Sequence, residues 1–74
     1  MKQLEMINAI IRVSRKLNQE VTFVFADDEF VEVLLMNERF RLTNNGNVSA
    51  VEGPFCVYNS MAHILTILVN EVTQ

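Results

Sequence analysis

Three consecutive carboxylates, Asp27-Asp28-Glu29, form the densest group of side chains in the sequence that could hold a metal ion. Carboxylate oxygens suit Mg²⁺ or Ca²⁺, but a calcium-binding loop spaces its ligands at alternate positions and needs a glycine at its bend. This segment has neither feature. Short acidic residues also favour tight turns, because their side chains accept hydrogen bonds from nearby backbone amides. We therefore predict a solvated turn here and no metal site.

His63 and Cys56 are the single histidine and the single cysteine of the chain. A histidine base needs a nucleophile or an orienting carboxylate within reach, and the nearest acid on its predicted helix, Glu71, is two turns away. Cys56 lies within an apolar run, a setting that disfavours the reactive thiolate. The two glycines of the chain form no phosphate-binding loop. We therefore expect neither an enzyme nor a cofactor site.

Five basic side chains could contact a nucleic-acid backbone. They are Arg12, Arg15 and Lys16 on the polar side of a predicted helix, and Arg39 and Arg41 on one face of a predicted sheet. Acidic residues are interleaved with them, and Glu52 is predicted opposite Arg39, a cross-strand pair worth at most about 1 kcal/mol. A phosphate-binding stripe would lack such neutralisation, so nucleic-acid binding is the alternative hypothesis. A second alternative is a phage-type acidic inhibitor that mimics nucleic acid. We favour it less, because such mimicry needs a dense acidic surface and the nine acids are spread along the chain.

Size and composition narrow the class of protein. The chain has 74 residues, half of them apolar, and a net charge of −3, which indicates a single small folded domain over residues 1–74. It shows no signal-peptide pattern and no apolar run of membrane-spanning length, so we expect a cytoplasmic protein with no membrane contact. A domain this small buries only roughly 60% of the surface that its unfolded chain exposes. Without a second cysteine for an internal disulfide, a partner chain is a common source of added stability.

Hydrophobic periodicity predicts the elements that carry these residues. Apolar residues recur at helical spacing over residues 3–19 and again over residues 61–72. Between them, alternating or β-branched segments predict strands over residues 21–25, 31–36, 39–42 and 48–52. This order predicts an α+β domain, a helix followed by a four-stranded antiparallel meander and a second helix, with the helices packed on the sheet.

Turn residues and apolar matching set the register that we predict for the sheet. The dipeptide Asn45-Gly46 suits the two positive-φ positions of a type I′ turn, and pairing about it sets Phe40 opposite Val51. A second tight turn is predicted at Asn37-Glu38. In the first hairpin, matching apolar residues sets Phe25 opposite Val31 and Phe23 opposite Val33. The core face would then carry Val21, Phe23, Phe25, Val31, Val33, Leu35, Phe40, Leu42 and Val51. The half-polar face would carry Thr22, Val24, Glu32, Leu34, Met36, Arg39, Arg41 and Ala50.

The predicted fold has more apolar surface than it can bury. The apolar arc of the first helix spans about 180° on a helical wheel, wider than the roughly 100° that one core contact needs. Two helices on the core face would leave the other sheet face partly open, whereas one helix on each face would leave part of the first helix uncovered. Because a contiguous exposed apolar patch marks an interaction site, we predict a non-enzymatic protein-interaction module, a homodimer that regulates or inhibits a partner protein. The candidate interface residues are Leu34, Met36, Met61, Ile64, Leu65, Leu68 and Val72, the alternative being that residues 61–65 are simply core.

Overall fold

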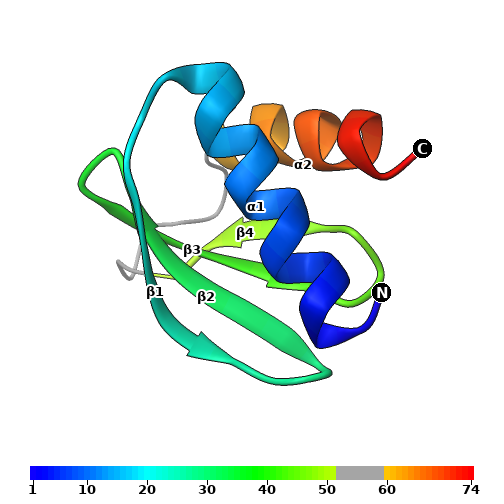
Figure 1. Cartoon of the computed structure of the whole chain (residues 1–74). Coiled ribbons are helices and arrows are strands. Elements are labelled where there is room, and N and C mark those ends of the chain that lie inside the picture. Colours follow the sequence, from blue (N-terminus) through cyan, green and yellow to red (C-terminus); the bar gives the residue numbers. More distant parts are fainter. Residues whose placement is uncertain (52–59) are drawn as a thin grey trace.

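The computed structural model describes residues 1–51 and 60–74 (Figure 1). Its elements are α1 (Gln3–Leu17), β1 (Val21–Ala26), β2 (Phe30–Leu35), β3 (Glu38–Thr43), β4 (Val48–Ala50) and α2 (Ser60–Thr73). The strands form one antiparallel sheet in the order β1-β2-β3-β4. The predicted α+β class and the order of helix, meander and helix are therefore confirmed. The predictions made for Glu52 and Cys56 fall outside the described residues.

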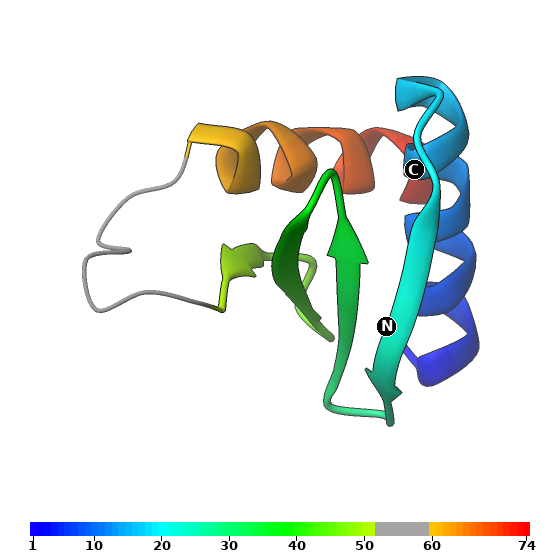
Figure 2. The same ribbon diagram turned by 90° about the vertical axis from the view of Figure 1, so that its left-hand side faces the viewer.

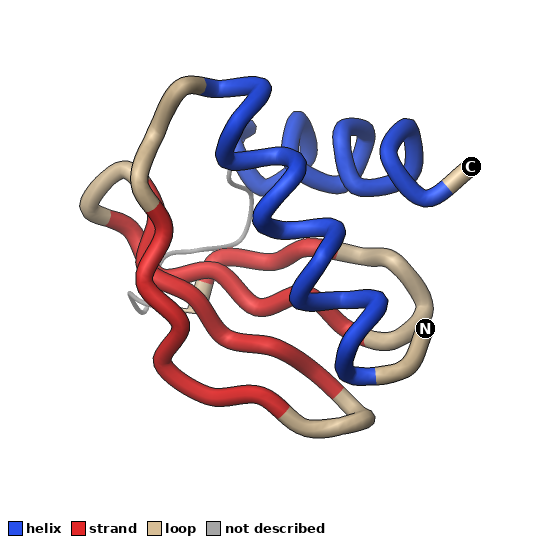
Figure 3. The backbone as a smooth tube through the Cα atoms, in the orientation of Figure 1, coloured by secondary structure: helices blue, strands red, loops and turns tan. Residues whose placement is uncertain are grey.

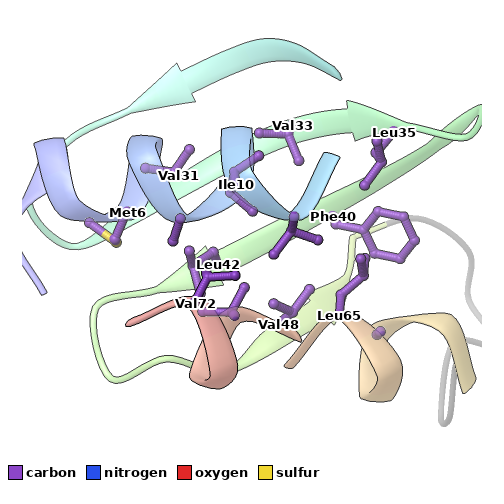
Figure 4. Close-up of a cluster of buried hydrophobic side chains, with 14 residues drawn as sticks. Met6, Ile10, Val31, Val33, Leu35, Phe40, Leu42, Val48, Leu65 and Val72 are labelled. Atoms are coloured by element: carbon purple, nitrogen blue, oxygen red, sulfur yellow. The ribbon is translucent and has the colours of Figure 1, made fainter. Parts of the chain in front are cut away.

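Both helices pack on the same face of the sheet, which we call the inner face (Figure 3). α1 lies over β1 and β2, whereas α2 contacts β4 and crosses α1 (Figure 2). Figure 4 shows how side chains from the two helices meet those of β2 and β3 in one core. The largest fully buried side chains are Met6, Ile10, Val13, Val31, Val33, Leu35, Phe40, Leu42, Leu65 and Val69. Neither α1 nor α2 packs on the opposite face of the sheet, which we call the outer face.

α1 ends two residues earlier than the periodicity predicts. Asn18 adopts a left-handed backbone conformation, with a φ of 53°. Its amide donates to the carbonyl of Arg15, and the amide of Gln19 donates to the carbonyl of Ser14 at 3.0 Å. This pair of bonds is the Schellman motif, which satisfies the last carbonyls of a helix and turns the chain away. The chain then enters β1 after the short connection 18–20.

The two hairpin turns on either side of β3 differ from the predictions. The turn between β2 and β3 is Met36-Asn37, whose φ values of 53° and 62° are those of a type I′ turn, so the prediction at Asn37-Glu38 is wrong by one residue. In the next hairpin only Gly46 has a positive φ, 91°. The amide of Gly46 donates to the carbonyl of Thr43, and the amide of Thr43 donates to the carbonyl of Asn47. This is a three-residue loop with a left-handed glycine at its end, rather than the predicted type I′ turn.

The longer loop shifts β4 by one residue from its predicted register. Phe40 lies opposite Ala50 and Leu42 lies opposite Val48, so the predicted pairing of Phe40 with Val51 is wrong. A slip of one residue moves every side chain of a strand to the other face. Val48 and Ala50 consequently lie on the inner face, where Val48 is buried.

A β-bulge in β1 changes the face of Phe25. Phe23 keeps its predicted partner in β2, but Phe25 lies opposite Glu32 instead of Val31, because Val24 is an extra residue between them. Phe25 therefore lies on the outer face and is 48% exposed. Phe23 lies on the inner face but at the edge of the sheet, where 36% of it is exposed. The predicted core positions of both phenylalanines are wrong, one because of the bulge and the other because of the edge.

Candidate protein-interaction surfaces

The outer face of the sheet carries a compact group of aromatic, charged and aliphatic side chains. Strand alternation and pairing place six residues there, which we call the outer-face cluster. They are Phe25, Phe30, Glu32, Leu34, Arg39 and Arg41. Phe25 and Leu34 are its most exposed apolar members, at 48% and 42%. Neither α1 nor α2 covers this face, so these exposed apolar side chains are available to another molecule.

Glu32 organises the charged part of the outer-face cluster. Arg41 donates to its Oε1 at 3.0 Å, and the Nε of Arg39 lies 3.8 Å from its Oε2. The guanidinium of Arg41 also lies over the ring of Phe30, 4.2 Å from its centroid, and this ring is 5.2 Å from that of Phe25. Ion pairing and cation–π attraction together restrict the arginine rotamers. Glu32 is only 8% exposed, although it lies on the outer face.

The seven predicted interface residues lie in three different settings. Two are exposed to a similar extent, Leu34 at 42% on β2 and Ile64 at 43% on α2. Three are partly buried against the core: Met36, Met61 and Leu68. Two lie in the core: Leu65 and Val72. Within one copy of the chain, only the exposed pair presents much surface, and its members lie on separate elements.

Among the described residues, five large apolar side chains that were not predicted to lie in an interface are also exposed. They are Leu4, Phe23, Val24, Phe25 and Ile67. Ile67 lies one turn from Ile64 on α2, at the margin of the apolar arc, and Leu4 has the same marginal position on α1. Such margins can be recognised on a helical wheel. The exposure of the two phenylalanines has no signal in the sequence, because it depends on the bulge and on which strand forms the sheet edge.

The basic residues of the nucleic-acid hypothesis do not gather on one surface. Arg12 donates to the carbonyl of Val72 at 2.9 Å, and Lys16 lies 3.6 Å from Glu71. These contacts fasten α1 to the C-terminal end of α2, on the inner side of the sheet. The two arginines of the outer-face cluster lie on the opposite side. The sheet therefore separates the groups that the hypothesis would need to combine.

The carboxylates of the β1–β2 turn bind backbone amides. Oδ1 of Asp27 accepts from the amides of Glu29 at 2.8 Å and Phe30 at 3.0 Å. Oδ1 of Asp28 accepts from the amide of Gln3 at 3.0 Å, so it caps the first turn of α1 from another part of the chain. Within residues 1–51 and 60–74, no three His, Cys, Asp or Glu side chains are grouped so that they could hold a metal ion. The hydrogen bonds of Asp27 and Asp28 give these two carboxylates a structural role in the turn and at the start of α1.

Comparison with protein families, curated proteins and solved structures finds no match for this chain. In its described part, neither helix has the length and apolar character needed to span a membrane. Three exposed surfaces of the described residues could bind another molecule. These are the outer-face cluster, the open edge of β1 and the exposed side of α2.

Proposed function

We propose that this chain is a non-enzymatic protein-interaction module that binds another protein through the outer-face cluster and thereby regulates or inhibits it. The observation that carries the proposal is that both helices pack on the inner face. Exposed Phe25 and Leu34 are consequently left beside two arginines on a sheet face that neither helix covers. An apolar patch with a polar rim of this kind is characteristic of protein contacts. We further propose that the module is cytoplasmic and works as a homodimer.

The ordering of the arginines favours a protein partner. Arginine and aromatic side chains are enriched where interface residues contribute most to affinity. Immobilising a flexible side chain on binding costs about 0.5–1.5 kcal/mol, and contacts with Glu32 and Phe30 restrict Arg41 before any partner arrives. Glu32 is already almost fully withdrawn from water. A partner that covers this face therefore removes little further water from the Glu32 carboxylate.

Single-stranded nucleic acid remains the alternative occupant of the same face. Proteins that bind it combine aromatic side chains, on which bases stack, with arginines that contact the backbone. Phe25, Phe30 and Arg41 supply that combination here. Two features disfavour it: Glu32 neutralises part of the positive charge, and the remaining basic side chains lie across the sheet. The acidic-mimic alternative is weaker still, since such mimicry needs a dense one-sided acidic surface.

A matched pair of charge substitutions tests the proposed surface. Leu34→Glu and Ile64→Glu change side chains of nearly equal exposure on the outer face and on α2. Affinity capture from the source cells followed by mass spectrometry should recover the same partner with wild type and Ile64→Glu, and lose it with Leu34→Glu. The reverse pattern would move the interface to α2, and retention by both variants would exclude these two positions as essential contacts.

Two further measurements address the alternative hypotheses. Nuclease treatment before capture, and fluorescence anisotropy with mixed-sequence single-stranded oligonucleotides, identify nucleic-acid binding. We expect the captured partner to resist nuclease and the oligonucleotides not to bind at physiological salt. Oligonucleotide binding that weakens steeply with salt would favour the alternative. A turnover activity that disappears in His63→Ala would contradict the non-enzymatic assignment.

A further inference from the structure

We propose that two copies of this chain pair edge to edge through β1, forming one continuous eight-stranded sheet with their α1 helices packed together across the two-fold axis. The inference rests on the homodimer in the proposed function and specifies its interface. It does not depend on what binds the outer face.

β1 is the exposed edge of the sheet, and β4 is the protected one. β4 has only three residues, and the amide of Val48 donates to Oγ1 of Thr66 on α2 at 2.9 Å. β1 has six residues, none of them charged and none of them proline. Native edge strands are normally blunted by such residues or by being short, and an edge without them is a template for pairing.

The pairing pattern identifies which backbone groups of β1 face outward. The two-residue turn makes Leu35 and Glu38 a hydrogen-bonded pair between β2 and β3, so the intervening residue Leu34 directs its backbone groups toward β1. Thr22 lies opposite Leu34 and therefore bonds inward. Its neighbours Val21 and Phe23 consequently direct their N–H and C=O groups away from the sheet.

The other half of the edge is already occupied or distorted. The carbonyl of Ala26 accepts a hydrogen bond from Nε2 of Gln3 at 3.1 Å, and the bulge at Val24 interrupts the strand. The segment available for pairing is thus Val21 to Phe23. This short segment sets a single register for a second copy.

In that register the segment is complementary to itself. Val21 of each copy lies opposite Phe23 of the other, which makes two hydrogen-bonded pairs, each exchanging both of its N–H···O=C bonds. Thr22 then lies opposite Thr22 of the other copy, a favourable cross-strand pair. Side chains of each pair share a face, so the inner and outer faces of the two sheets continue into each other. No charged residue of one β1 opposes a like charge of the other β1.

The flank of α1 above this edge is apolar and uncovered. The opposite flank, with Arg12 and Lys16, contacts α2. On the β1 side lie Leu4, which is 68% exposed, and the partly buried Ile7 and Ile11. This flank explains the unusually wide apolar arc of the helix, since one side of the arc packs on the sheet and the other remains for a second copy.

Strand spacing brings the two helices to packing distance. α1 contacts both β1 and β2, so its axis runs above the line between them. In a continuous sheet with strands about 4.8 Å apart, two such axes are about two strand spacings, or roughly 10 Å, from each other. Packed helices are separated by about 8–10 Å. A second copy therefore places the uncovered flanks at about the distance at which helices pack.

The position of the axis along α1 follows from the rise of each element. Gln3 lies beside Ala26, and α1 runs alongside β1 in the opposite direction (Figure 2). Four residues of β1 from Ala26 to Thr22 rise about 13 Å, which equals about nine residues of helix. The axis through Thr22 therefore passes near residue 12, beside Ile11. We expect Ile11 to contact the other copy closest to the axis, with Leu4 further out.

Cysteine cross-linking tests the register directly. In a Cys56→Ser background, Thr22→Cys places two thiols at a non-hydrogen-bonded pair, where Cα atoms about 4.5 Å apart suit a disulfide. We expect mild oxidation to convert this variant to a covalent dimer on a non-reducing gel. Ser49→Cys, an exposed position on β4, is the matched control and should remain largely monomeric. Equal cross-linking of the two variants would overturn the proposed register.

Sedimentation velocity tests the helix contact on the purified protein at tens of micromolar. We expect wild type and the control Asn8→Lys to sediment at twice the 8.5 kDa of one chain. Ile11→Lys brings two like charges together in the contact, so its dimer Kd should rise by about a hundredfold with the circular dichroism spectrum unchanged. A wild type of 8.5 kDa, or an Ile11→Lys dimer as tight as that of wild type, would refute the inference. Leu34→Glu should stay dimeric, which separates this test from that of the outer face.

Discussion

Thr66→Val should destabilise the fold by removing the hydrogen bond that joins α2 to the sheet. Oγ1 of Thr66 accepts from the amide of Val48 at 2.9 Å and donates to the carbonyl of Ala62 at 3.0 Å. Val48 is buried, and its pairing with Leu42 directs its amide away from β3. The substitution replaces the hydroxyl with a methyl of similar size and leaves that amide without its acceptor.

The expected loss of unfolding free energy in Thr66→Val follows from the buried Val48 amide that is left without an acceptor. An unsatisfied buried donor costs about 1–3 kcal/mol, whereas threonine and valine have similar helix propensities and contribute little to the difference. A domain of this length has a free energy of unfolding of roughly 4–11 kcal/mol, so the expected loss is a large fraction of the total. Each 1 kcal/mol should lower the Tm by about 4–8 °C.

Thr73→Val is the matched control for this measurement. Thr73 makes the same bond to the carbonyl one turn back, that of Val69 at 2.8 Å, but it is exposed and makes no hydrogen bond to the sheet among the described residues. Urea unfolding followed by circular dichroism should show a change within about 0.5 kcal/mol for Thr73→Val. Hydrogen exchange should show the Val48 amide losing protection only in Thr66→Val. Equal free energies of unfolding for the two variants would refute the reasoning.

Three further substitutions test other parts of the fold by the same unfolding assay. Asp28→Ala removes the tertiary cap of α1 and should cost about 1 kcal/mol, whereas Asp28→Asn, which keeps an acceptor oxygen, should cost less; equal losses would exclude capping as the cause. Asn37→Gly places the preferred residue at the second position of the type I′ turn and should stabilise the protein by up to about 1 kcal/mol; a loss would contradict the observed turn. Leu65→Ala should cost about 2–5 kcal/mol and Ile64→Ala much less, because Leu65 is in the core and Ile64 is exposed; similar losses would contradict their placement.

The sequence alone determines the type and order of the elements. A period of 3.6 residues over the two helices and a period of two over the strands reflect backbone geometry, and neither depends on what the elements pack against. Local chemistry also places a turn after β2 and a glycine in the hairpin before β4. The sequence determines the end of α1 less well. Several polar residues near residue 18 could end the helix, and the structure shows that Asn18 is the one with the left-handed conformation.

Only the tertiary structure decided which side chains are exposed. Period-two alternation shows which residues of a strand share a face, but one extra residue reverses the assignment, and such residues occur at Val24 in β1 and in the loop that ends at Gly46. The placement of both helices on one face depends on packing between distant segments. It leaves Phe25 and Leu34 on an open sheet and Phe23 on an open edge. The sequence therefore predicts that the domain has more apolar surface than it can bury. Where that surface lies depends on the strand register, on the bulge in β1 and on which face of the sheet the helices cover.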